Sequence, residues 1–325
     1  MLSILHGDNP QNLFAAFGVK VPEQVLDFST NTNILAWPEV HVDLERLASH
    51  YPDPQCSRLR KLIAEREHIP PSRILFTNGS NEAIFLLGQV LTGNTGIMRP
   101  AYSEYSRGFA DLQGTFTLTD AGAFANFIVI NPNNPTGKFI PDLSRTVREN
   151  PSTMFIVDEA YRDFLLYTEP ERLCDFHNVI LIRSLTKIFH LSGARIGYVI
   201  APEDVIAAMR ERQPSWSVNA IAQELAEFFL RDEGFIVRTR EFYRENTPAF
   251  IERLRQAGCE VLESDVHFFL VRVRDDEKVI THFLRRGIAV RHTRNFAGLD
   301  GKYIRIATRR PSENKKLIAA KEVLG

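Results

Sequence analysis

The chain has 325 residues, of which 44% are hydrophobic and 24% are charged, so it can form a large core and is not a single small module. Its formal net charge of -1 leaves no basic field for a nucleic acid, so small molecules or further subunits are the expected partners. The three cysteines, Cys56, Cys174 and Cys259, are widely separated, which predicts a reducing compartment without a disulfide framework or a clustered metal site.

The N-terminal residues MLSILHGDNP lack the basic region and the long apolar region of a secretory signal. No apolar run in the chain approaches the roughly 20 residues that a membrane-spanning helix needs. We therefore expect a soluble, cytoplasmic protein with no membrane partner.

The middle of the chain alternates short apolar runs with helical patterns, which is typical of a mainly parallel sheet covered by helices. Residues 73–77 predict a strand, and residues 81–91 predict the helix that follows it. Three further strands are predicted at residues 127–130, 154–157 and 179–182. The sequence therefore predicts a sheet with at least these strands.

Beyond the last of these strands the pattern becomes helical, first at residues 219–235 and then in a charged stretch at 238–255. The rest of the chain mixes strands at 267–273 and 303–307 with a helix near 277–286. This mixture is typical of a compact α+β domain.

The change of pattern places a domain boundary near residue 240. Residues 31–240 are expected to form a large domain and residues 241–325 a small one. Residues 1–30 are expected to pack with the small domain rather than with the large one.

Each predicted strand of the middle region ends in a polar cluster, at residues 78–81, 131–137, 158–161 and 183–187. In open α/β sheets, ligands bind beyond the carboxyl ends of the strands, so these clusters should converge on one crevice. Such convergence predicts an enzyme.

Lys187 follows the last of these strands, with Ser184 and Thr186 close by and Arg195 further along. A lysine amine forms a Schiff base with a carbonyl cofactor once it is partly deprotonated, and partial burial beside a cation favours the neutral amine. The two hydroxyls and the guanidinium suit a phosphate dianion. An isolated lysine is more often a solvated surface charge, so this prediction depends on the neighbouring residues.

Asp158 and Tyr161 lie together in DEAY, at the end of another strand. A pyridine ring acts as an electron sink only while its nitrogen is protonated, and a nearby carboxylate raises the pKa of that nitrogen. Tyr161 could reach the ring hydroxyl from the same side, together with Asn134 from the segment NPNNPTG. The alternatives are that Asp158 caps a helix and that NPNNPTG is a tight connection.

The segment NGSNE places Gly79, Ser80 and Asn81 at the start of a predicted helix. Free amide groups and the positive end of the helix dipole make such a position an anion site. A plain helix cap is the alternative interpretation.

NPNNPTG, DEAY and SLTK followed by GARIG resemble, in this order, the motifs of the fold-type I aminotransferases, and the resemblance covers nearly the whole chain. It implies a pyridoxal 5'-phosphate enzyme of α/β class, with a mainly parallel seven-stranded sheet in the large domain and a smaller α+β domain. It also implies that Lys187 forms the internal Schiff base and that Asp158 pairs with the pyridinium nitrogen. Asn134 and Tyr161 would then contact the ring hydroxyl.

The same resemblance assigns the cofactor phosphate to a set of polar residues, namely Ser80, Asn81, Ser184, Thr186 and Arg195. Tyr102 matches the aromatic residue that stacks on the ring, with a core tyrosine as the alternative. Tyr51, in HYPD, matches a tyrosine that reaches the phosphate in the neighbouring subunit, so a homodimer is implied.

Within this superfamily the chain is similar to the histidinol-phosphate aminotransferases and, more closely, to the threonine-phosphate decarboxylases of cobalamin biosynthesis. The segments that favour the second group are HGDN, LDFSTNTN, HYPD, RSLTKIFHLSGARIGY, PSWSVNA and the run from VRHTRNFAGLD through YIRIATRRPSEN. The residues that this resemblance places at the substrate are His6, Gly7, Asn31, Asn134, Arg291, Arg305 and Arg309.

Arg305 matches the arginine that grips a substrate carboxylate, a task that its planar donor fork suits. The alternatives are that Arg305 is an exposed strand arginine, that Arg309 is an ordinary surface charge and that His6 is solvated. Asp8 stands where the related element has a second glycine, which adds a negative charge near the proposed phosphate site.

The implied reaction is decarboxylation of L-threonine O-3-phosphate to (R)-1-amino-2-propanol O-2-phosphate, with Lys187 returning a proton to Cα. The bond that lies perpendicular to the conjugated ring is the one that breaks, so a different substrate pose gives transamination. A histidinol-phosphate-type aminotransferase is therefore the alternative. A catalytically inactive cofactor-binding protein is disfavoured because all the reactive groups are present.

Overall fold

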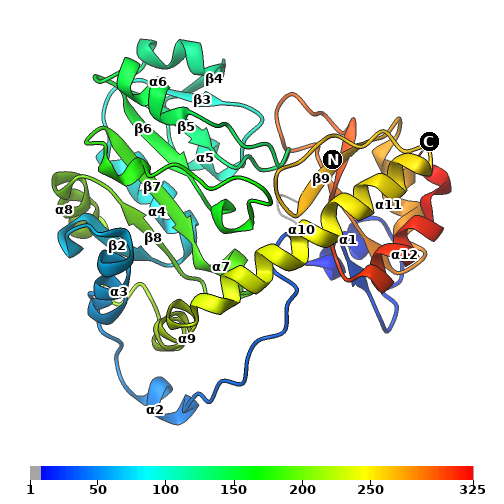
Figure 1. Ribbon diagram of the computed structural model, residues 1–325, viewed down its shortest axis with the longest axis horizontal. Coiled ribbons are helices and arrows are strands. Elements are labelled where there is room, and N and C mark those ends of the chain that lie inside the picture. The colour runs from blue at the N-terminus through cyan, green and yellow to red at the C-terminus, as the bar shows by residue number, and fades with distance from the viewer. Residues whose placement is uncertain (1–8, 325) are drawn as a thin grey trace.

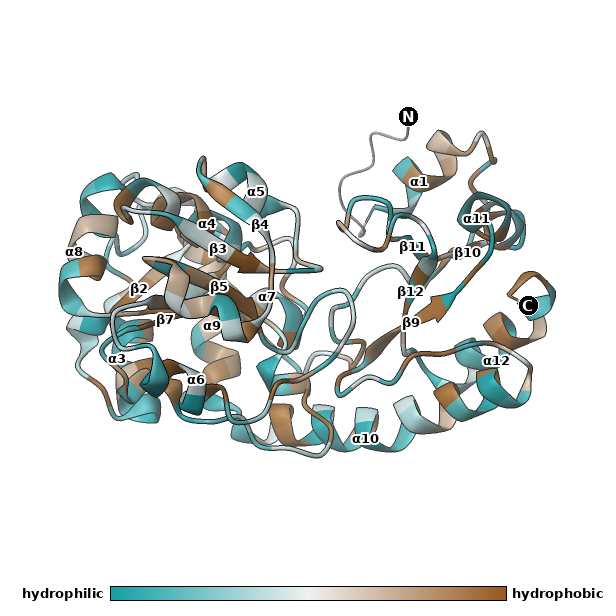
Figure 2. Ribbon diagram, turned by 90° about the horizontal axis from the view of Figure 1, so that it is seen from above, coloured by the Kyte–Doolittle hydropathy of each residue, from teal (hydrophilic) through white to brown (hydrophobic). Residues whose placement is uncertain are grey.

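The computed structural model describes residues 9–324. The ribbon has a larger body built on a wide sheet and a smaller body that contains both described ends of the chain (Figure 1). Helix α10 (Glu233–Gln256) runs along both bodies (Figures 1 and 2).

The sheet of the larger body has seven strands in the order β2-β8-β7-β6-β5-β3-β4. Strand β8 runs antiparallel to both of its neighbours, whereas the other pairs in the sheet are parallel. The predicted α/β class with a mainly parallel seven-stranded sheet is thus confirmed. The strands are β2 (Ile74–Thr77), β3 (Thr95–Met98), β4 (Leu112–Phe116), β5 (Asn126–Ile130), β6 (Met154–Asp158), β7 (Val179–Ser184) and β8 (Gly197–Ile200).

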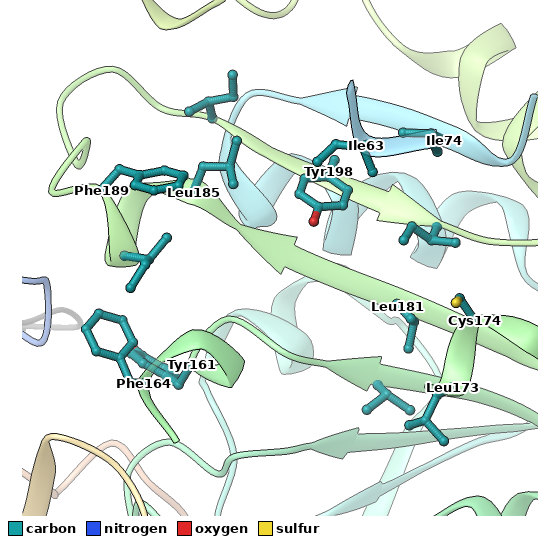
Figure 3. Close-up of a cluster of buried hydrophobic side chains, with 14 of the residues drawn as sticks. Ile63, Ile74, Tyr161, Phe164, Leu173, Cys174, Leu181, Leu185, Phe189 and Tyr198 are labelled. Carbon is teal, nitrogen blue, oxygen red and sulfur yellow. The ribbon is translucent and has the colours of Figure 1, made fainter. Parts of the chain in front are cut away.

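The central strands have apolar residues at successive positions. Since successive side chains point to opposite sides of a strand, both faces of the sheet are apolar there. Phe127, Phe155 and Leu181 belong to one buried cluster, whereas Ile128 and Ile156, their neighbours in the sequence, belong to another. Figure 3 shows part of the first cluster, and Figure 2 shows the hydrophobic character of the sheet. The continuous apolar runs of these strands therefore follow from burial between two layers of helices.

The helices of the chain begin at polar caps in several places. Side chains of Asn219, Asp232 and Asp275 accept hydrogen bonds from the first backbone amides of α9, α10 and α11. The helices are α1 (Pro10–Ala16), α2 (Leu44–Ser49), α3 (Ser57–Glu67), α4 (Gly79–Val90), α5 (Glu104–Gly108), α6 (Leu143–Glu149), α7 (Leu185–Ile188), α8 (Glu203–Arg212), α9 (Ala220–Arg231), α10, α11 (Asp276–Leu284) and α12 (Pro311–Ala319). Among residues 9–324, none of them combines the length and apolar character of a membrane span.

The smaller body contains a three-stranded antiparallel sheet in the order β11-β12-β9 and a two-stranded parallel sheet of β1 and β10. These strands are β1 (Leu26–Asp27), β9 (Phe268–Arg272), β10 (Ile288–Ala289), β11 (Arg291–His292) and β12 (Tyr303–Ala307). Pairing of β1 with β10 joins the beginning of the described chain to its C-terminal part.

Leu13, Phe14 and Phe28 lie in one buried cluster with Phe250 and Phe269, so early residues of the described chain pack against late ones. The expected boundary near residue 240 falls within the continuous helix α10. The division of the chain into residues 1–30, 31–240 and 241–325 remains a prediction.

The strands predicted in the middle region correspond to β2, β5, β6 and β7. Sequence reasoning missed β3, β4 and β8. Strand β8 consists of only GYVI and follows the loop of the GARIG motif, so it has no helical stretch before it to mark it as a separate strand.

Candidate active site

The carboxyl ends of β5, β6 and β7 open into a cavity of about 290 Å³. Elements of both bodies line it, which is where an open α/β sheet binds its ligands. Of the residues predicted for the site, those that line this cavity are Asn31, Ser80, Asn81, Tyr102, Asn134, Asp158, Tyr161, Thr186, Lys187, Arg195, Arg291 and Arg305.

Other predicted residues lie beside the cavity or away from it. Gly79 and Ser184 are close to lining residues but are not part of the wall, and Arg309 is not part of it either. Tyr51 is 82% exposed, and its ring packs at a tilt against that of Trp216, with ring centroids 4.6 Å apart. His6 and Gly7, like Asp8, lie outside the described residues.

Asp158, at the end of β6, is a buried carboxylate with an oriented set of donors. Its Oδ2 accepts a hydrogen bond from the Tyr105 hydroxyl at 2.9 Å, and its Oδ1 accepts one from the Ala160 amide at 3.0 Å. Burial raises the pKa of Asp158 to about 6, although these two hydrogen bonds and the charge of Lys187 act in the opposite direction. Asp158 is therefore held in one orientation beside the cavity.

Tyr105 was not predicted as a site residue. It is fully buried in α5, and burial together with the Asp158 charge raises its pKa well above the ordinary value. The second tyrosine of RPAYSEY was a signal for it, since a buried tyrosine hydroxyl needs a polar partner.

Lys187 lies in α7, the short helix that directly follows β7. The Lys187 carbonyl accepts a hydrogen bond from the Asn33 amide at 2.9 Å, and the Leu185 amide donates to the Ile196 carbonyl at 3.3 Å. These bonds tie α7 to the start of β8 and to the loop after β1. The Lys187 side chain thus enters the cavity from a backbone fixed on two sides.

The N-terminus of α4, the Arg195 guanidinium and the Thr186 hydroxyl meet at one corner of the cavity, which we call the anion-binding corner because these groups could hold an anion. Gly79 has a φ of +72°, and a Cβ there would lie 2.5 Å from Nη2 of Arg195. Glycine is therefore required for the guanidinium to lie against the first turn of the helix. The buried Ser184 hydroxyl lies 2.7 Å from that of Thr186.

Arg305 and Arg291 project into the cavity from adjacent strands of the smaller body. They are Cα partners in the β11–β12 pair, so their side chains share one face of the sheet. Each is 4% exposed, and the alternative that Arg305 is an exposed strand arginine is therefore wrong. Nη2 of Arg291 donates to Asn295 Oδ1 at 3.0 Å, which orients that guanidinium.

Arg305 makes contacts with both bodies. Its Nη1 donates to Asn134 Oδ1 at 2.7 Å, its Nη2 donates to the Ser29 carbonyl at 2.7 Å, and its guanidinium carbon lies 5.3 Å from the ring centroid of Phe268. The Asn134 amide nitrogen remains directed away from this contact, because the oxygen is the atom that accepts from Arg305.

Arg309 supports the site indirectly. Its Nη1 donates to the Asp27 carbonyl at 2.8 Å, and its Nη2 pairs with Glu313 at 3.2 Å. The Asp27 side chain in turn accepts from the amides of Ser29 and Thr30, at 2.8 and 3.3 Å. Arg309 thus stabilises the turn at Asp27, in which Ser29 and Thr30 line the cavity.

Sequence reasoning missed some lining residues, among them Ser29, Thr30, Ser192 and Phe296. The DFST segment carried a signal for the first two, since an aspartate that accepts backbone amides two and three residues on forms a tight polar turn. No comparable local signal marked Phe296, which reaches the cavity from the connection between β11 and β12.

The sequence profile described as aminotransferase class I and II matches residues 24–320 of the chain. Members of that family bind pyridoxal 5'-phosphate. The cavity suits this group chemically, because it offers a lysine amine, a buried carboxylate and, in the anion-binding corner, helix amides with a guanidinium.

Several curated proteins are similar over most of the chain. The threonine-phosphate decarboxylase of Salmonella typhimurium is 31% identical, with 97% of this chain and 95% of that protein covered. A histidinol-phosphate aminotransferase of Caldicellulosiruptor saccharolyticus is 29% identical, with 93% and 92% covered. The adenosylcobalamin biosynthesis bifunctional protein CobDQ of Leptospira interrogans is 30% identical over 97% of this chain, which spans 40% of that protein's length.

A solved structure is similar in both sequence and fold. The L-threonine-O-3-phosphate decarboxylase from Porphyromonas gingivalis is 27% identical, with a TM-score of 0.81, and the match covers 92% of this chain and 98% of that chain. The likeness therefore extends over both bodies of the molecule.

Proposed function

We propose that this chain, which belongs to the class I and II aminotransferase family, decarboxylates L-threonine O-3-phosphate to (R)-1-amino-2-propanol O-2-phosphate, for the nucleotide loop of cobalamin. The pairing of Arg291 with Arg305 carries this proposal, because it presents two buried guanidinium groups side by side. A substrate with both a carboxylate and a phosphate matches two such groups. Similarity to proteins named threonine-phosphate decarboxylase supports the same choice.

We assign the cofactor phosphate to the anion-binding corner and its ring to the space between Tyr102 and Asp158. The phosphate-binding residues in this proposal are Gly79, Ser80, Asn81, Ser184, Thr186 and Arg195. Asp158 would hold the ring nitrogen, whose positive charge favours the ionised form of a carboxylate that burial otherwise disfavours. Tyr161 and Asn134 would donate to the ring hydroxyl, and Lys187 would hold the cofactor covalently.

Bound pyridoxal 5'-phosphate supplies the electron sink for the bond that breaks at Cα. Arg305 would bind the substrate carboxylate, and Arg291 would bind its phosphate. These two contacts set the rotation of the substrate about Cα, and hence which bond lies perpendicular to the ring. The amine of Lys187 would then deliver a proton to Cα after loss of carbon dioxide.

We also assign roles to the four remaining predicted substrate residues, Asn31, Arg309, His6 and Gly7. Asn31 lines the cavity next to Tyr161, so it can contact either the cofactor or the substrate. Arg309 acts in this proposal through the Asp27 turn rather than by direct contact. His6 and Gly7, outside the described residues, are assigned to the substrate phosphate by resemblance alone.

A histidinol-phosphate-type aminotransferase is the second candidate, supported by the relative of that name at 29% identity. Both reactions use the same lysine, so the distinguishing feature is the pose of the substrate. An inactive cofactor-binding protein is disfavoured because Lys187, Asp158 and Tyr161 all line one cavity.

We also propose a homodimer in which Tyr51 reaches the cofactor phosphate of the neighbouring subunit. The 82% exposure of Tyr51 and its contact with the exposed Trp216 ring support this, because an exposed aromatic pair is suited to burial by a second subunit. Sedimentation of the unchanged protein tests the dimer, and a monomer that retains full cofactor affinity would contradict it.

The central experiment is incubation of the cofactor-loaded enzyme with L-threonine O-3-phosphate in the absence of any keto acid. Release of carbon dioxide in large stoichiometric excess over enzyme is the expected result. Conversion of the cofactor to pyridoxamine phosphate, with turnover stopping after one half-reaction, would instead identify an aminotransferase.

A further inference from the structure

We propose that His267 is a positioning residue that acts through Asn31 to direct the phenol of Tyr161 toward the cavity. His267 immediately precedes β9 of the smaller body, whereas Tyr161 follows β6 of the larger one. A hydrogen-bonded connection between the two bodies thus ends at a residue of the candidate active site.

The His267 ring is fully buried in an aromatic cage. It stacks on Phe164 with ring centroids 3.9 Å apart, and the centroids of Tyr243 and Phe268 lie 4.9 and 5.2 Å away. The centroid of the Tyr161 ring lies 6.1 Å away. Such a cage solvates an imidazolium poorly, so the ring is held in its neutral form.

The charged groups near His267 also favour its neutral form. Burial, with the positive charges of Arg305 and Lys187, lowers its pKa to about 3, although the hydrogen bond to Asn31 opposes the shift. His267 therefore carries one ring proton throughout the working pH range.

The position of that proton is determined by the partner of the ring. Nε2 of His267 lies 2.8 Å from the backbone carbonyl of Asn31, which can only accept, so Nε2 carries the proton. Nδ1 then has no hydrogen-bond partner among the described residues. A buried nitrogen without a partner is unfavourable, so packing alone does not explain a histidine in this cage.

The connection continues from Asn31 to the phenol. The Asn31 side-chain amide donates to the Tyr161 hydroxyl oxygen, which acts as the acceptor in that contact. The hydroxyl proton of Tyr161 is thereby left to donate elsewhere, and Tyr161 lines the cavity. His267, Asn31 and Tyr161 thus form a one-directional series of donors that ends at the cavity.

The consequence for the cofactor rests on the proposed contact between Tyr161 and the ring hydroxyl. A donor at that oxygen stabilises its negative charge and so lowers the proton affinity of the Lys187 nitrogen in the cofactor linkage. If His267 no longer holds Asn31, the donor at Tyr161 is less well directed. The proton affinity of the linkage nitrogen should then rise.

The test compares His267→Phe, which keeps an aromatic ring in the cage but removes the donor, with His267→Gln, which restores an N–H group. The measurement is the pH midpoint of the visible absorption band of the cofactor-loaded protein without substrate. We expect His267→Phe to raise the midpoint by about 0.5–1 pH unit, the size of a weakened hydrogen bond to a charged group, and His267→Gln to reverse most of it.

Two further variants separate positioning from packing. Phe164→Leu removes the stacking partner but no donor, so its midpoint should equal that of the unchanged protein even if its stability falls. Adding His267→Phe to Asn31→Ala should produce no additional shift. An unchanged midpoint in His267→Phe, or an equal shift in Phe164→Leu, would overturn the proposal.

A measurement on the unchanged protein covers the case in which His267→Phe does not fold. Nitrogen-15 shifts of the His267 ring should report the neutral Nε2–H form at every pH from about 5 to 8. An imidazolium or an Nδ1–H form would overturn the proposal. Neither measurement uses threonine phosphate, so failure of the decarboxylase proposal leaves this one intact, and the reverse also holds.

Discussion

The two ends of the cavity, named for the cofactor and the substrate that we propose they bind, are built in different ways. At the cofactor end, Asp158 is the last residue of the buried strand β6, and Lys187 lies in the short helix that follows the neighbouring strand β7. At the substrate end, Asn31, Arg291 and Arg305 come from a loop and two strands that are far apart in the chain. The first end is defined by short segments, whereas the second depends on how the smaller body packs on the larger one.

This difference suggests how one scaffold accommodates different substrates. The cofactor end is tied to the buried core of the sheet, where changes are costly. At the substrate end, Asn31 lies in a loop and Arg291 lies on the edge strand β11, where side chains can be exchanged with less effect on the core. Variants at the two ends should therefore separate cofactor chemistry from substrate recognition.

The largest effect is expected from Lys187→Ala, which removes both the covalent attachment and the proposed proton donor. Turnover should fall by roughly 10³-fold or more, because general acid–base groups alone contribute factors of that order. The visible absorption of the linkage should disappear while the far-ultraviolet circular dichroism persists. Lys138→Ala is the matched control, since Lys138 pairs with Glu263 at the surface. Unchanged visible absorption in Lys187→Ala would exclude Lys187 as the attachment point.

Asp158→Asn should lower turnover by about 10²-fold, because a lost charge-assisted hydrogen bond of about 3 kcal/mol corresponds to that factor. The same substitution should raise the free energy of unfolding of the cofactor-free protein near neutral pH. Since burial raises the pKa of Asp158 to about 6, its contribution to stability is present at low pH and is lost as the pH rises through that value.

The asparagine variant should therefore be more stable than the unchanged protein at pH 7.5, by about 2–3 kcal/mol for a shift of about two pH units. This advantage should shrink steadily as the pH falls toward about 4.5. Urea unfolding of the cofactor-free proteins across this range measures it. An advantage that is independent of pH would show that Asp158 is not the titrating group.

Arg291→Gln should affect the substrate end alone. The Michaelis constant for L-threonine O-3-phosphate should rise by about 10–100-fold, the equivalent of one lost ionic contact of about 1.5–3 kcal/mol. The absorption of the bound cofactor and its affinity should not change. Arg272→Gln, at a half-exposed site paired with Glu260, is the control. A lower affinity for the cofactor in Arg291→Gln would contradict the separation of the cavity into two independent ends.

Tyr105→Phe should produce the smallest effect. Removal of the hydroxyl that donates to Asp158 should raise the pKa of that carboxyl above its value of about 6 in the unchanged protein. A neutral donor contributes about 1 kcal/mol, so turnover should fall only about fivefold. Carbon-13 titration of the Asp158 carboxyl measures the shift, with the exposed Tyr167→Phe as control. A lowered Asp158 pKa would contradict this assignment of the hydrogen bond.

The cofactor end was largely predictable from the sequence for a physical reason. Strand periodicity and turn residues locate the carboxyl ends of β5, β6 and β7, and parallel strands bring those ends to one edge. The polar clusters that follow the strands therefore had to meet. RPAYSEY contains Tyr105 as its second tyrosine, but its contact with Asp158 was missed because that contact joins α5 to β6, and no local pattern encodes which residue is the partner.

The substrate end was predictable mainly through resemblance. Local patterns do not reveal that Arg291 opposes Arg305, since this depends on the register of two short strands. They also do not reveal that Arg309 turns toward Asp27 and Glu313 rather than into the cavity. His267 gave no signal either, because its partners lie in three separate segments of the chain.

The pairing of β11 with β12 has a consequence for how this protein can change by insertion or deletion. Alternate residues of a strand face opposite sides, so a one-residue slip of β11 would withdraw Arg291 and present His292 in its place. A permanent positive charge would be exchanged for one that depends on pH. Point substitutions can adjust the substrate end gradually, but a change in the length of this hairpin would switch its charge in a single step.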